Sequence, residues 1–159
     1  MPNAVSVDVA DAVTSMLAAA TLSQKITPER SYADWELPLE TMDRLYVNVV
    51  AHTTKQKLEL GTRGGSLTYR IPVDVCIRER LGQDREDGDT GRLENTRIDA
   101  LMLLTQEVYE TFLPKRLTTF EAGAWESTEI VVAPDAKLLR ENRQFTSVVR
   151  VTFKVDRQL

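Results

Sequence analysis

The sequence predicts an α+β protein: a mostly antiparallel sheet of four to five strands with two helices packed on one face. Two long stretches, residues 67–80 and 145–156, alternate apolar and polar side chains, as expected for strands with one buried face. Two others, residues 5–20 and 93–113, repeat apolar residues at helical spacing. A chain of 159 residues with these patterns is predicted to form a single domain, residues 1–159.

The composition excludes several classes of protein. With 42% hydrophobic and 28% charged residues the chain is neither disordered nor collagen-like. A net charge of −4 and a pI of about 5.1 do not favour nucleic acid or an acidic membrane as the main partner. No apolar run approaches the ~20 residues that span a bilayer, and no basic segment opens a signal peptide. A single cysteine, Cys76, fits synthesis in a reducing cytoplasm.

The first third of the chain is expected to run helix, strand, strand. Ser6 is the predicted N-cap of the helix at residues 5–20. A short strand follows at residues 23–26, interrupted by Pro28, and the second strand covers residues 43–51. Between the two strands, Trp35 anchors an irregular segment that either covers the core or marks an interface.

The segment at residues 52–66 is long for a connection between antiparallel strands, where ~2–5 residues are usual. It carries three cationic residues against Glu59, and Gly64 and Gly65 supply a turn. We expect a protruding loop, which either becomes ordered against another subunit or remains solvated.

The strand at residues 67–80 is interrupted by Pro72, which cannot donate a ladder hydrogen bond and indicates a free or irregular edge there. Its polar face, together with that of residues 145–156, is expected to face water or a partner. This set comprises Thr68, Arg70, Asp74, Arg78, Thr146, Arg150, Thr152 and Lys154.

An acidic, glycine-punctuated loop follows at residues 82–92, with Asp84, Glu86, Asp87 and Asp89. Such oxygen-rich loops can hold Ca²⁺, but the spacing lacks the calcium-hand pattern, so we expect a solvated loop or a charge-matched contact.

The second half is expected to run helix, strand, short turn or helix, strand. The helix at residues 93–113 ends before Pro114, and the width of its apolar stripe suggests burial. A strand is predicted at residues 125–133 and a turn or short helix at residues 134–144. The closing strand should lie beside residues 67–80, because both have long apolar faces to bury.

The residues offer little catalytic chemistry. His52 and Cys76 are placed at opposite ends of an antiparallel pair, so they are not expected to form a catalytic dyad. No zinc-protease, phosphate-loop, dinucleotide or nucleophile-elbow motif is present. The chain is therefore predicted not to be an enzyme and to need no cofactor or metal.

Nucleic-acid binding is a second possibility. Arg70, Arg78, Arg150 and Lys154 share one predicted sheet face. Tyr69 and Phe153 fall on the opposite face, so the aromatic platform that stacks single-stranded bases is missing.

Four segments resemble the small neck and tail-end proteins of tailed bacteriophages, with the tail terminator (tail completion) family as the nearest group. The resemblance is carried by VADAVTSMLAAA at 9–20, SQKITPERSY at 23–32, IDALM at 98–102 and RQFTSVVRVTF at 143–153. It covers nearly the whole chain, and its motifs are structural rather than catalytic.

The resemblance implies a small α/β subunit of the virion, assembled in the host cytoplasm into a ring, usually a hexamer. The ring would cap the tail tube protein, join the head–tail connector or stopper protein, and contact DNA only passively. By position we expect the subunit interface to include Trp35, Lys55, Lys57, Leu58, Leu60, Arg63, Asp84, Glu86, Asp87 and Asp89. The alternatives are a head-completion or adaptor protein of the same neck, or a nucleic-acid-binding module.

Overall fold

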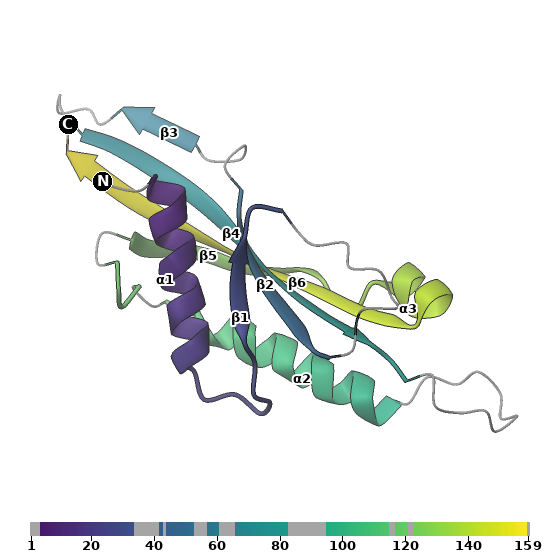
Figure 1. The fold of residues 1–159 in the computed structure, drawn as a ribbon. Coiled ribbons are helices and arrows are strands. Elements are labelled where there is room, and N and C mark those ends of the chain that lie inside the picture. The colour runs from purple at the N-terminus through teal and green to yellow at the C-terminus, as the bar shows by residue number, and fades with distance from the viewer. Residues whose placement is uncertain are drawn as a thin grey trace, which may run out of the picture.

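The computed structural model describes residues 4–33, 42, 44–52, 57–60, 66–82, 95–114, 117–120 and 123–158. The elements run α1 (Val5–Ala19), β1 (Pro28–Ser31), β2 (Tyr46–Ala51), β3 (Lys57–Leu60), β4 (Ser66–Arg80), α2 (Asn95–Thr111), β5 (Gly123–Val132), α3 (Ala136–Asn142) and β6 (Gln144–Gln158) (Figure 1). The predicted α+β class is confirmed. None of the described helices is both long and apolar enough to cross a bilayer.

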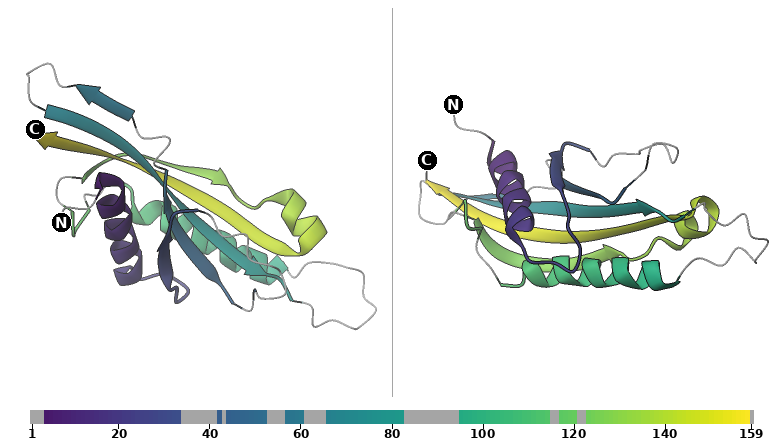
Figure 2. Two further views of the ribbon diagram at one scale, coloured as in Figure 1. Left: turned by 45° about the horizontal axis from the view of Figure 1, so that its top comes forward. Right: turned by 60° about the horizontal axis from the view of Figure 1, so that its bottom comes forward.

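The sheet has six described strands, in the order β1-β2-β4-β6-β5, with β3 added beside β4. Only β1 and β2 are parallel, so the mostly antiparallel sheet is confirmed. The two long strands β4 and β6 pair along their full length, from Ser66 opposite Gln158 to Arg80 opposite Gln144. The prediction that these two strands are neighbours is therefore confirmed, and the pair runs along the length of the sheet (Figures 1 and 2).

Pro72 lies where two strands meet the same side of β4. The register of β2 against β4 ends at Val73, and that of β3 begins at Arg70. The carbonyl of Pro72 accepts the backbone N–H of His52 at 3.0 Å, so the Pro72 nitrogen faces His52 as well. The missing donor thus leaves out the return bond from Pro72 to His52, and the edge of β4 is irregular at Pro72, as predicted.

One hydrophobic cluster forms the core. It joins the odd-numbered residues of β4 and β6 with the apolar stripes of α1 and α2. Phe153 of β6 and Phe112 meet edge to face, with ring centroids 6.4 Å apart. The cluster includes Val9, Val13, Leu17, Ile71, Val73, Val75, Ile77, Leu101, Leu104, Val108, Phe145, Val149 and Val151.

Two local predictions near the N-terminus are wrong. The N-cap of α1 is Ala4, without a side-chain hydrogen bond, and Ser6 is buried inside the helix. The first strand is at Pro28–Ser31 instead of residues 23–26. Gln24 shows why, since its side-chain amide donates to the carbonyl of Ala100 on α2 at 3.0 Å. The segment around Gln24 is thus bound to α2 instead of pairing in the sheet. Pro28 can begin β1, because a proline is tolerated as the first residue of a strand.

The protruding loop predicted at residues 52–66 contains a strand, and residues 53–56 and 61–65 of that segment lie outside the described part of the chain. Residues Lys57–Leu60 form β3, which pairs antiparallel with β4 from Lys57 opposite Arg70 to Leu60 opposite Leu67. β3 lies beside the end of β4 that extends beyond α1 (Figures 1 and 2). The short helix allowed at residues 134–144 is present as α3, where the Asp135 carboxylate caps two backbone N–H groups.

Candidate functional site

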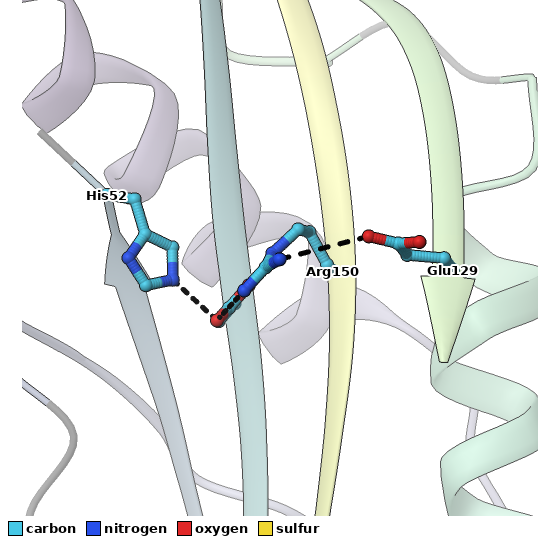
Figure 3. A network of polar contacts seen from close by, with 4 residues as sticks. His52, Glu129 and Arg150 are labelled. Atoms are coloured by element: carbon cyan, nitrogen blue, oxygen red, sulfur yellow. Dashed lines mark hydrogen bonds and ion pairs between the residues drawn. The ribbon is translucent and has the colours of Figure 1, made fainter. Parts of the chain in front are cut away.

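A chain of four charged or polar side chains crosses the sheet on the even-numbered face (Figure 3). Asp74 on β4 lies directly opposite Arg150 on β6, and the guanidinium donates to both carboxylate oxygens at 2.7 and 2.9 Å. His52, just after β2, lies 2.5 Å from the second oxygen through Nε2. Glu129 on β5 extends the chain, 3.9 Å from Arg150. The four side chains thus connect four neighbouring strands.

Asp74 is the centre of this chain. Burial alone would raise the pKa of Asp74, but hydrogen bonds from Arg150 and His52 outweigh it and hold that pKa below its usual value. The carboxylate is therefore ionised at neutral pH and can only accept hydrogen bonds, so Nε2 of His52 carries the shared proton. The same ion pair raises the pKa of Arg150.

The face around Asp74 is more enclosed than the sequence predicts. Asp74 and Thr146, both expected to face water or a partner, are buried, and the other six residues of that set are partly buried. Asn48, Val50 and Cys76 on the same face are buried too. The alternation of apolar and polar residues correctly assigns side chains to the two faces of the sheet. It does not predict whether the polar face is buried by other parts of the chain.

This chain of side chains contains no hydroxyl or thiol nucleophile. His52 lies beside Pro72, whereas Cys76 is paired with Asn48, four residues away along β2. The predicted separation of His52 and Cys76 is confirmed. No group of three or more metal-ligating side chains occurs in the described part of the chain. With both oxygens of Asp74 engaged by Arg150 and His52, the arrangement serves to fix strand register.

The lowered pKa of Asp74 predicts acid sensitivity. A depressed folded-state pKa contributes stability above the unfolded value of about 3.9, and this contribution is lost as pH falls through the folded value. We expect the stability difference between the wild type and Asp74→Asn to be constant from pH 7 to about 5 and to shrink below about pH 4. Urea unfolding at several pH values measures it. A difference that stays constant down to pH 2 would contradict the prediction.

The predicted basic patch is partly neutralised. Arg70 donates to Glu126 on β5 at 2.6 Å, and Arg150 is held by Asp74. Two of its four cations therefore have carboxylate partners within the chain. This leaves a weak electrostatic basis for nucleic-acid binding, which relies on cations available to phosphates.

A second surface lies between α2 and β5. Its groove has a volume of about 570 Å³ and is rimmed by acidic side chains. Among the described residues five large apolar side chains are exposed, and four of them belong to these two elements: Met102, Leu103, Ile130 and Val131. We call this the α2–β5 groove; it is lined by Asp99, Met102, Leu103, Thr105, Gln106, Tyr109, Glu110 and Ile130.

The sequence did not predict an exposed apolar groove on α2. The apolar stripe of α2 is so wide that burial was expected, and Leu101 and Leu104 are indeed buried. Met102 and Leu103 sit between them on the outer side of the helix, 36% and 49% exposed. The run LMLL, apolar around more of the helix than one sheet can cover, was the signal that could have indicated an exposed face.

The interface predicted from the sequence falls mostly outside the described residues. Lys57, Leu58 and Leu60 belong to β3, where the backbone pairs with β4. The remainder lie outside the residues that the structure describes: Trp35, Lys55, Arg63, Asp84, Glu86, Asp87 and Asp89.

Comparison with known proteins does not assign this chain to a group. No protein-family model matches the sequence, and no curated protein matches it significantly. The α2–β5 groove and the polar chain around Asp74 are therefore interpreted from their own geometry.

Proposed function

We propose that this chain is a structural subunit of the neck of a tailed bacteriophage, most specifically a tail terminator. In this role copies of the chain form a ring, usually a hexamer, that caps the tail tube and joins the head connector. The proposal draws on the four segments that resemble that family and on a small α+β fold compatible with it. It places the protein in the virion, after assembly in the host cytoplasm.

One observation carries the proposal: four of the five large apolar side chains exposed among the described residues belong to two elements that form an open surface with an acidic rim. Met102, Leu103 and Ile130 line the α2–β5 groove, beside the edge strand β5. Contiguous exposed apolar patches rimmed by polar groups are typical of contacts between proteins. The best-connected polar cluster, around Asp74, is engaged in internal bonds.

The second candidate is a head-completion or adaptor protein of the same neck. It would use the same open surface, so tail-tube binding distinguishes the two. A nucleic-acid-binding module is disfavoured, because Arg70 and Arg150 pair with carboxylates inside the chain.

Tube assembly in vitro tests the proposal. Purified protein is added to polymerising tail tube protein from the same phage, and tube lengths and tube ends are recorded by negative-stain electron microscopy. A terminator is expected to shorten the tubes and leave a ring at one end. Unchanged tube lengths and bare ends, with binding only to the head connector, would contradict it and favour the adaptor.

A further inference from the structure

We propose that the α2–β5 groove of one copy receives the β1 edge of the next copy, with Tyr32 as the inserted side chain. This contact rests on the proposed ring and specifies its two surfaces. The groove and β1 belong to opposite ends of the strand order β1-β2-β4-β6-β5. A head-to-tail ring needs two different surfaces that complement each other.

Tyr32 is the exposed aromatic residue that fits this role. It follows β1 and is 76% exposed, the largest value among the exposed apolar side chains of the described residues. The guanidinium of Arg30 lies 5.1 Å from the centre of its ring, which limits the rotamers that binding would have to freeze. Tyrosine is among the residues that most often dominate interface energetics.

The charges of the two surfaces are complementary. α2 and β5 carry five acidic residues, Asp99, Glu107, Glu110, Glu126 and Glu129, against the single cation Arg97; Glu126 and Glu129 contact Arg70 and Arg150 of the same chain. Arg97 is itself paired with Glu79 on β4. At the opposite edge, exposed Lys25 and Arg44 line a hollow of about 300 Å³ together with Glu29. Unlike charges on the two rims would orient the copies and penalise groove-to-groove contact.

The two edges also match face by face. Tyr32 lies near α1 and shares a small hollow with Ser6 and Ala10, on the same side of the sheet as the groove. Glu29 is in register with Asn48, which places Lys25 and Arg44 toward the other side. Glu129 of β5 points to that other side, toward Arg150. Two sheets placed edge to edge in the same orientation therefore bring Tyr32 to the apolar groove, and Lys25 and Arg44 to the side that carries Glu129.

Side chains, rather than backbone pairing, should make this contact. The register of β5 against β6 shifts at Glu126 and again at Val131, giving two irregularities within ten residues. Bulges of this kind disrupt the regular row of donors and acceptors that another strand would need. A second copy that presents side chains therefore fits this edge better than an added strand.

Cysteine cross-linking tests the contact. Ala33→Cys chains, which keep the Tyr32 ring and carry the thiol at the exposed neighbouring position, are mixed with Leu103→Cys chains and treated with a short bismaleimide; the native Cys76 is buried. We expect a cross-linked dimer from the mixture and little from either variant alone. The matched control replaces Leu103→Cys with Ala136→Cys, an exposed position on α3 outside both surfaces. Without cysteine substitutions, Tyr32→Ala should weaken self-association at least ~30-fold by sedimentation, because it removes the inserted ring.

The outcomes separate this contact from the proposed function. No cross-link between positions 33 and 103, or a cross-link no stronger than the Ala136→Cys control, overturns the contact even if rings still form on tubes. A strong 103-to-103 cross-link also overturns it, because the groove would then meet itself. A specific 33-to-103 cross-link with unaltered tail tubes would support the contact and contradict the terminator role.

Discussion

Replacing Asp74 with alanine is expected to lower the free energy of unfolding by about 3–5 kcal/mol. Asp74 accepts both guanidinium hydrogen bonds of Arg150 and one from His52, and its side chain is only 9% exposed. Without it, the ion pair that Arg150 keeps among the described residues is the long contact with Glu129 at 3.9 Å. Chemical unfolding in urea at pH 7 measures the loss.

Glu129→Ala provides the matched control for Asp74→Ala. It removes one carboxylate from the same chain of side chains, but Glu129 is 64% exposed and its contact is long. We expect a cost of no more than about 1 kcal/mol. In the double variant Asp74→Leu/Arg150→Met, most of the stability should return, because no buried charge is left unpaired. Equal losses for Asp74→Ala and Glu129→Ala would contradict the central place given to Asp74.

Phe153→Ala is expected to cost about 3–5 kcal/mol, the second large effect. Phe153 is 1% exposed, packs edge to face on Phe112 and belongs to the cluster that joins both long helices to the sheet. Its removal leaves a cavity between β6 and α2 that neighbouring side chains can fill only in part.

Thr152→Ala, one residue away on the opposite face of β6, is the control for Phe153. Thr152 is partly buried on the even-numbered face, so we expect a loss below about 1 kcal/mol. Urea unfolding of both variants compares the two faces directly. Similar losses would show that the two sides of β6 are not as different as the register of the strands implies.

The sequence predicted the elements whose periodicity is long. β4 and β6 each run for fifteen residues, so strict alternation over many positions identified both strands and their buried faces. α1 and α2 were found by the same argument at helical spacing. The irregular edge at Pro72 could be predicted because proline has no backbone N–H and is tolerated in a sheet at only a few kinds of position.

The short elements were not predictable from pattern. β1 and β3 have four residues each, too few for alternation to differ from chance. What makes them strands is backbone pairing with β2 and β4, which only the tertiary structure supplies.

The polar chain and the groove were missed for a different reason. The sequence placed Asp74 and Arg150 on one face, but their direct opposition depends on the register of β4 against β6. Likewise, the exposure of Leu103 depends on how much of α2 the sheet covers. The polar chain and the groove both depend on how helices and strands pack against one another, which cannot be predicted from the pattern of a single segment.

The mass of the native assembly tests the central claim most directly, namely that this chain functions by assembling with copies of itself. Native mass spectrometry on the free protein and on complexes isolated at tube ends supplies it. The account predicts a discrete multiple of the 17.9 kDa chain, six for a hexamer. A single 17.9 kDa chain at every concentration, with nothing recovered on tube ends, would contradict it.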